Sequence, residues 1–296
     1  MSANVQHRPT WMGEPKAVTK LAKAIALIVT VLLVLFPFWI VVATSLADPQ
    51  EVIANGGYVI WPQRPTLDIY KSLIDEGVVT KAMLISTGVT LVGTAISLAC
   101  TVFLAYALSR PQIVGGSLIL KLILFTFLFP AGMIPNYLVV QNTQLTDTYA
   151  ALVLPFLVSV FNLVVMRGFF MGIPAELLEA ARMDGAGEFG VLWRVVLPLS
   201  KSVVAVVGLF YGVTYWNRWF EAILYLNDSQ MWPLGTVLRS YVNAGAGGDA
   251  GSESLAFAPQ SMQMAVVVLA TLPIVCVYPF IQRYFAKGVL LGAVKG

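Results

Sequence analysis

The chain has 296 residues and a formal net charge of +3, and 58% of its residues are hydrophobic while only 11% are charged. Because an average soluble domain is about 25% charged, this composition excludes an ordinary soluble globular protein. The charged residues gather in short intervals between apolar runs long enough to cross a bilayer core of about 30 Å. We therefore expect an all-α integral membrane protein whose surface contacts lipid.

The residue types that most often build metal or redox sites are scarce in this sequence. Cys100 and Cys276 both lie in apolar runs, so we expect small buried hydrophobic residues and neither a disulfide framework nor a metal site. His7, the only histidine, lies in the polar N-terminal stretch, which excludes histidine-based relays or metal sites within the membrane. No basic patch with interleaved aromatic residues indicates nucleic acid as a partner.

The apolar runs predict six membrane-spanning helices. Their expected ranges are 24–46, 82–108, 117–140, 149–170, 202–226 and 262–284. Together they form one transmembrane domain of residues 24–284, preceded by a tail of residues 1–23 and followed by a tail of residues 285–296. The first run is too long for a secretory signal, so we expect an uncleaved anchor.

The distribution of Lys and Arg predicts the orientation, since positively charged loops stay in the cytoplasm. One side of the membrane would hold Arg64, Lys71, Lys81, Arg218 and Arg239, and the other side all remaining Lys and Arg. Both termini and residues 171–201 are therefore predicted to face the cytoplasm, as in a multi-pass protein of the cytoplasmic (inner) membrane. The glycine-rich stretch 243–252 would then be external, either as a slack linker or as a mobile loop that binds a partner.

The most informative stretch is the predicted cytoplasmic segment. Pro174 suits the first position of a helix, and Glu176 lies where the helix dipole favours an acid. Gly185 can close that helix in the left-handed conformation, and a second helix from about Glu188 should end near Pro198. We expect a helix-turn-helix over about 174–198 that lies on the membrane surface.

The first of these two helices has the composition of a docking element. Ala180 and Ala181 give it a small-residue face that another protein can approach closely, while Glu179 and Asp184 offer charges for pairing with Arg or Lys. The alternative interpretation is an amphipathic interfacial helix that only joins two spans.

The spacing of these residues resembles a known signature. The order Glu179-Ala180-Ala181, three residues, Gly185, nine residues, Val195, one residue and then Leu197-Pro198 is similar to the "EAA" signature of membrane subunits in binding-protein-dependent ABC importers. Valine at 195 replaces the more usual isoleucine. The resemblance implies a type I importer permease whose coupling helix fits a cleft in an ATPase subunit. The coupling residues it implies are Glu179, Ala180, Ala181, Asp184, Gly185, Leu197 and Pro198.

The resemblance also implies the partners: a homologous second permease, two ATPase subunits and an external sugar-binding protein. ATP and Mg²⁺ would bind in the ATPase, and Glu179 would pair with a basic ATPase residue. The chain itself lacks the phosphate loop G-x-x-x-x-G-K-[ST] and any converging nucleophile and base. We therefore expect no catalytic residue, no metal, no cofactor bound by this chain and no enzymatic activity of its own.

The resemblance covers about residues 84–296 and is greatest to the carbohydrate-uptake branch, in particular to permeases for aldouronate and alginate-type oligosaccharides. It rests on residues 129–137, 159–167, 216–222 and 287–296. Amino acids, peptides or phosphate are alternative solutes, although the spans contain no basic cluster for phosphate. An ion-driven secondary transporter would require buried acids in the spans, and Glu221 is the only candidate.

Polar and aromatic side chains in the fourth and fifth spans are candidates for the substrate pathway, because proteins bind sugars with aromatic rings and hydrogen-bonding amides. The candidates are Asn162, Tyr211, Trp216, Asn217 and Trp219. Trp216 and Trp219 should share one helix face, but they are equally suited to anchor the span at a membrane interface. For Glu221 an ion pair with Arg218 is a better explanation than a direct sugar contact.

Overall fold

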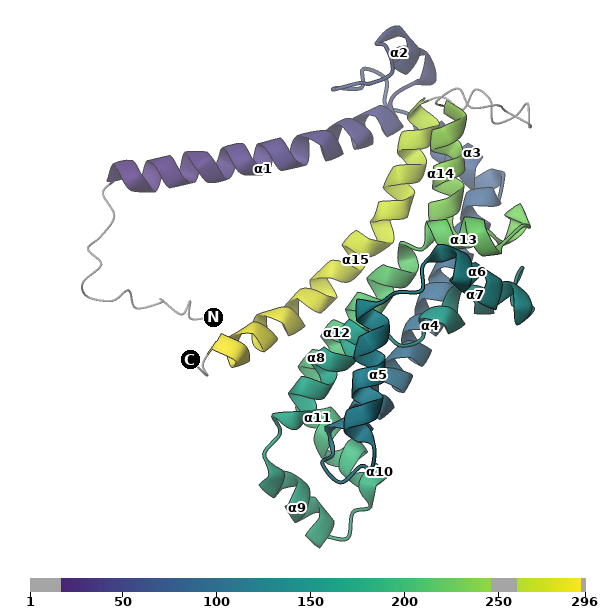
Figure 1. Ribbon diagram of the computed structural model, residues 1–296. Coiled ribbons are helices and arrows are strands. Elements are labelled where there is room, and N and C mark those ends of the chain that lie inside the picture. The colour runs from purple at the N-terminus through teal and green to yellow at the C-terminus, as the bar shows by residue number, and fades with distance from the viewer. Residues whose placement is uncertain (1–16, 246–259, 294–296) are drawn as a thin grey trace.

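The computed structural model describes residues 17–245 and 260–293, which fold almost entirely as helices (Figure 1). An isolated bridge between Ala47 and Pro65 is the only β pairing in these two ranges. The predicted all-α class is confirmed. Residues 1–16 with His7, most of the glycine-rich stretch and residues 294–296 lie outside the described ranges.

Fifteen α-helices and three short turns of other helix types make up the described chain. They are α1 (Ala17–Leu46), α2 (Pro49–Ala54), α3 (Asp68–Asp75), α4 (Val78–Ser109), α5 (Gly116–Leu128), α6 (Met133–Asn142), α7 (Ala150–Val153), η1 (Leu154–Phe156), α8 (Val160–Met171), α9 (Ala175–Met183), α10 (Glu188–Val191), η2 (Leu192–Val196), α11 (Leu197–Leu199), α12 (Lys201–Trp216), α13 (Trp219–Tyr225), η3 (Ser229–Met231), α14 (Leu234–Gly245) and α15 (Gln260–Ala293).

Three of the helices, α1, α4 and α15, are long and apolar enough to cross a membrane without a break. Three further spans are bent pairs of helices: α5 with α6 at 116°, α7 and η1 with α8 at 51°, and the α10–α11 stretch with α12 at 84°. Counting each pair as one span gives six spans, the number that the sequence predicts, but the third pair covers residues 188–216, whereas the sequence predicts a fifth span over 202–226. The third and fourth spans are therefore bent where the sequence predicts continuous helices, and the 84° bend at Ser200 lies just before the predicted fifth span.

Local sequence explains two of the breaks. Pro130 lacks an N–H and disfavours helix at the residue before it, and Gly132 then adopts a φ of +86°, so α6 leaves in a new direction. Pro155 lies in the turn η1, and the Ser159 hydroxyl accepts a hydrogen bond from the Asn162 N–H to begin α8. The predicted fifth span is interrupted at a different place from the bend at Ser200: α12 ends at Trp216, and α13 begins at Trp219.

The core of the bundle lies where α4 packs against α12. A Cβ atom on Gly93 would lie 3.0 Å from the Tyr215 ring, so the two helices approach closely at this glycine. Ser97 and Tyr215 share a hydrogen bond of 2.7 Å between their hydroxyls, one turn from the 2.6 Å bond between Thr101 and Tyr211. These buried bonds fix the register of α4 against α12.

The helix α1 stands apart from the rest of the bundle. It packs on α15 at one end and then diverges from it, and most of its apolar side chains are exposed (Figure 1). An apolar surface of this extent requires lipid or another protein as a neighbour. On α15, Cys276 is also exposed, so the prediction that it is buried is wrong: the helix turns this face away from the bundle. Cys100 is half-buried.

Candidate coupling site

The helix α9 projects from one end of the bundle, opposite the end that carries α2, α3 and α14 (Figure 1). It begins directly after Pro174 and has Glu176 in its first turn. It ends where Gly185 takes a φ of +82°, and the N–H groups of Gly185 and Ala186 donate to the carbonyls of Arg182 and Ala181. This left-handed glycine closes the helix and turns the chain toward α10.

The second arm of the helix-turn-helix is continuous from α10 through η2 to α11. Its middle is a π-helical turn, in which each N–H bonds to the carbonyl five residues earlier. This turn lies just before Pro198, which has no N–H to donate. The predicted end near Leu197 and Pro198 is confirmed, because the helix ends at Leu199 and the chain then bends by 84° at Ser200 into α12.

The side chains of α9 divide into a buried and an exposed group. Leu178 is buried against the bundle, and Ala181 is half-buried. Glu179, Ala180 and Asp184 are exposed, and Met183 is the most exposed apolar side chain of the helix at 88%. The acids and the small residue thus share an accessible surface, whereas Leu197 and Pro198 lie on the other arm.

One carboxylate joins this motif to α4. Glu188 Oε1 accepts hydrogen bonds from Arg182 Nη2 at 2.9 Å and Nε at 3.1 Å, and Glu188 Oε2 accepts one from the Tyr106 hydroxyl at 2.7 Å. The Arg110 guanidinium lies 4.3 Å from the centroid of the Tyr106 ring. The Tyr106 hydroxyl, followed by Arg182, lowers the pKa of Glu188, so this carboxylate stays ionised.

From the sequence, Glu188 is expected only to begin a helix, and Tyr106 is not among the candidate residues. Arg182 and Glu188 flank the turn at Gly185, so their ion pair could have been predicted from the sequence. Tyr106 lies 82 positions earlier and carries no local signal.

Beside these contacts a cavity of about 500 Å³ opens between α4 and α10. It is lined by Phe103, Tyr106, Ala107, Arg110, Gln112, Ile113, Arg182, Glu188, Phe189 and Leu192.

Two of the five substrate-pathway candidates, Asn162 and Tyr211, both hydrogen-bond to Ser159, whereas Asn217 lies at the end of α12. Asn162 is buried, with 4% of its surface exposed, near the beginning of α8. Tyr211 is 2% exposed, and its hydroxyl is bonded to Thr101 and accepts the Ser159 N–H at 2.8 Å. Asn217 is exposed and donates from Nδ2 to the Val213 carbonyl at 2.8 Å. Tyr211 thus joins α12 to α4 and to the beginning of α8, whereas Asn217 caps the end of its own helix α12.

The two tryptophans do not share a helix face, because α12 breaks between them. Trp216 ends α12 and donates from Nε1 to the Ala270 carbonyl at 3.3 Å, whereas Trp219 begins α13 under the Arg239 guanidinium. The predicted pair between Arg218 and Glu221 is confirmed, with 3.2 Å between Nη1 and Oε1. The Arg218 guanidinium also lies 3.4 Å from the centroid of the Phe156 ring.

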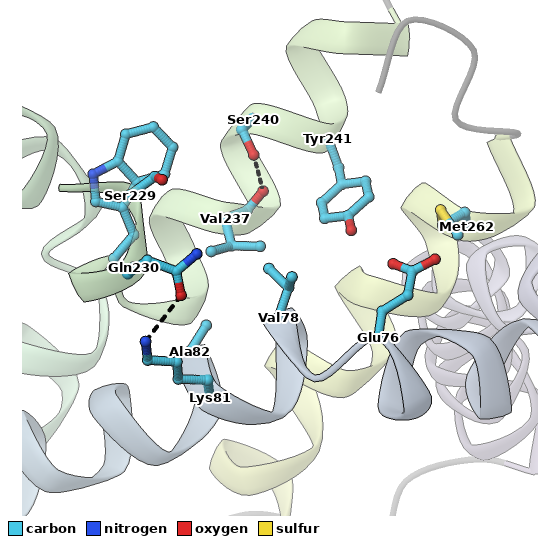
Figure 2. Close-up of a pocket in the computed structure, with 11 residues that line it drawn as sticks. Glu76, Val78, Lys81, Ala82, Ser229, Gln230, Val237, Ser240, Tyr241 and Met262 are labelled. Atoms are coloured by element: carbon cyan, nitrogen blue, oxygen red, sulfur yellow. Dashed lines mark hydrogen bonds between the residues drawn. The ribbon is translucent and has the colours of Figure 1, made fainter. Parts of the chain in front are cut away.

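A second cavity, of about 450 Å³, is lined by residues of α4 and α14 (Figure 2), and α14 lies at the end of the bundle far from α9 (Figure 1). Lys81 at the beginning of α4 donates from Nζ to Gln230 Oε1 at 2.9 Å across one side of it. Burial, together with the nearby Glu76 carboxylate, raises the pKa of Tyr241 on α14. None of the five pathway candidates lines this cavity or the one beside α10.

Comparison with known proteins decides the family. Residues 12–291 match the family model described as binding-protein-dependent transport system inner membrane component. The chain belongs to this family. It is 42% identical over 274 residues to the polygalacturonan/rhamnogalacturonan transport system permease protein YtcP of Bacillus subtilis, a match that covers 91% of this chain and 96% of YtcP.

Two other proteins support the same relationship. The protein LplC of Bacillus subtilis is 44% identical over 266 residues, covering 88% of this chain and 90% of LplC. A chain from the crystal structure of a bacterial ABC transporter involved in the import of the acidic polysaccharide alginate has a TM-score of 0.84 and 28% identity. That match covers 93% of this chain and 99% of the other, so this member of the family has the fold of an ABC importer permease.

Proposed function

We propose that this chain is the membrane permease subunit of an ABC importer for oligosaccharides that contain uronic acids. The cargo is inferred from the relatives, since one is named for polygalacturonan and the structural neighbour for alginate, and both are acidic polysaccharides. The alternative cargo, amino acids or peptides, shares the same fold and coupling signature.

In this proposal α9 is the coupling helix. The observation that carries it is the accessible surface of Glu179, Ala180 and Asp184 on a short helix that projects from the bundle and is closed by Gly185. Glu179 would pair with a basic residue in a cleft of the ATPase, and the small alanine would permit close approach. Closure of two ATPases around ATP would then move the two coupling helices together.

The positive charges support a cytoplasmic location for this end of the bundle. Arg110, Arg167, Arg182, Arg194 and Lys201 all belong to the segments that meet there, and both termini would lie on the same side. The partners would be a homologous second permease, two ATPase subunits and an external sugar-binding protein. ATP and Mg²⁺ would bind in the ATPase subunits and not in this chain, which would hydrolyse nothing alone.

The test is binding-protein-stimulated ATP hydrolysis by the reconstituted complex, with Glu179→Ala compared with wild type. Acidic oligosaccharides, neutral oligosaccharides, amino acids and peptides form the panel. We expect stimulation of wild type by acidic oligosaccharides and its loss in Glu179→Ala. Glu176→Ala is the matched control, because Glu176 is an exposed acid on the same helix outside the coupling set.

Full stimulation of Glu179→Ala would contradict the docking role of this residue. If the wild-type complex responded to amino acids or peptides and to no sugar, the oligosaccharide cargo would be rejected in favour of that alternative. Equal responses to neutral and acidic sugars would reject the preference for uronic acids.

A further inference from the structure

The link between the helix-turn-helix and α4 is narrow. The Phe103 ring meets the Phe189 ring edge-on, with 6.4 Å between centroids, and the Tyr106 hydroxyl bonds Glu188. Tyr106 also donates to the Glu188 carbonyl at 3.1 Å. The cavity of about 500 Å³ lies beside these contacts, so here polar bonds take the place of a continuous apolar interface.

Glu188 is the residue at which three helices meet. It belongs to α10, its first oxygen accepts from Arg182 in the last turn of α9, and its second accepts from Tyr106 near the end of α4. Hydrogen bonds to a charged group are the stronger ones among side chains. A displacement of α9 therefore pulls on Arg182, then on the Glu188 carboxylate, and then on Tyr106.

The far side of this chain of contacts is rigid. Through Ser97 and Thr101, α4 is bonded to Tyr215 and Tyr211 of α12, and Gly93 lets the two helices touch. Force applied at Tyr106 thus acts on α4 and α12 as one body. Because the Glu188 contacts lie at the partly exposed rim of the bundle, they can break and re-form without opening this core.

We propose that Glu188 is a positioning residue that transmits the displacement of α9 to α4, and that Tyr106 is the group that receives it. The inference rests on the proposed function, in which α9 is moved by an ATPase. Its direct consequence concerns coupling: without the Tyr106 hydroxyl, ATP hydrolysis should continue while less of it produces transport.

The experiment measures oligosaccharide transported per ATP hydrolysed by the reconstituted complex carrying Tyr106→Phe. This change keeps the ring beside Arg110 and removes only the hydroxyl. Tyr70→Phe is the matched control, because the Tyr70 hydroxyl donates to Ser45 Oγ at 2.7 Å at the opposite end of the bundle. We expect a several-fold lower ratio for Tyr106→Phe, with ATP hydrolysis retained, and a wild-type ratio for Tyr70→Phe.

A second variant decides the matter if Tyr106→Phe assembles poorly. Glu188→Gln keeps an oxygen that can accept from Tyr106 but loses the charge that holds Arg182, so we expect an intermediate ratio. The inference would be overturned if both variants transported as much oligosaccharide per ATP as wild type. If Tyr106→Phe fails to assemble, a wild-type ratio in Glu188→Gln alone would overturn it. If Glu179→Ala meanwhile abolishes stimulation, the proposed function stands and only this transmission route is rejected.

Discussion

Asp147 holds the end of α13 through Asn227. The Asn227 backbone N–H donates to Asp147 Oδ1 at 2.6 Å, and the Asn227 side-chain amide donates to Oδ2 at 2.9 Å. The Asp147 N–H in turn donates to the Tyr225 carbonyl at 2.9 Å. The loop between α6 and α7 is thereby tied to the end of the broken fifth span.

The Asp147 contact predicts a pH dependence of stability. The Asn227 side chain, followed by its backbone N–H, lowers the pKa of Asp147 from its ordinary value of 3.8. A lowered folded-state pKa means that the contribution is fully present above the ordinary value and is lost as the pH falls through the lower, folded-state value.

We therefore expect Asp147→Asn to lower the thermal midpoint of the detergent-solubilised protein at neutral pH, with the difference from wild type shrinking in acid. Asp68→Asn is the control, because its pair with Lys71 spans 3.5 Å and is largely exposed, so its loss should have little effect at any pH. A difference for Asp147→Asn that stays constant into acid would contradict the assignment.

Gly185→Ala tests the turn that closes α9. The φ of +82° at Gly185 is one that other residues rarely adopt, and nothing lies within 4 Å of an added Cβ. The cost is therefore conformational, about 1–2 kcal/mol, and should appear as reduced stimulation of the ATPase with the bundle intact. Gly187→Ala is the matched control, because it also has open space around its Cβ but a φ of −68°. Equal activity of the two variants would count against a strained turn.

Tyr211→Phe separates a packing role from a pathway role. Loss of the hydroxyl leaves the Ser159 N–H and the Thr101 hydroxyl without this partner in a buried site, which costs about 1–3 kcal/mol. We expect a lower thermal midpoint and no change in the apparent affinity for sugar. Tyr58→Phe, at an exposed tyrosine, should behave as wild type. A changed sugar affinity with unchanged stability would instead support the pathway role.

A double-mutant cycle on Arg218 and Glu221 measures how strongly their pair supports the break in the fifth span. The Arg218 side chain is only 12% exposed, so Glu221→Gln leaves a largely buried charge with a weakened partner. We expect a coupling energy of about 1–2 kcal/mol from urea denaturation of the single and double variants. A value near zero would show that stacking on Phe156 alone holds Arg218.

The sequence predicts this fold well where the determinants are local. Hydropathy alone gives six spans, and α1, α4 and α15 are continuous as predicted. Pro130 and Pro155, which are visible in the sequence, also indicate two of the breaks. The interruption between Trp216 and Trp219 could not be predicted, because no proline or glycine lies between these residues. Here Arg218 turns toward Phe156 and Glu221, and tertiary contacts override the local preference for helix.

The candidate site shows the same division. Gly185, Glu176 and the exposed acids of α9 belong to one continuous stretch of chain, so their spacing was enough to place a helix-turn-helix. The Tyr106 contact with Glu188 depends on how α4 and α10 pack across the bundle. Trp216 and Trp219 are predicted to share a helix face because they are three residues apart. This spacing places two residues on one face only within a continuous helix, and the helix breaks between them.

The broken spans also make the molecule's lipid perimeter uneven. At 1.5 Å per residue, α5 and α8 are about 20 Å and 18 Å long, well short of a hydrocarbon thickness of about 30 Å. The breaks in the fourth and fifth spans lie close together, where Arg218 covers Phe156, and α6 contacts α13 nearby through the stacking of Tyr137 on Tyr225. Peptide groups freed at such depth are tolerated only against protein or water. Acyl chains can therefore surround α1 over most of its length, but this broken sector must be sealed by a neighbouring subunit or border an aqueous vestibule.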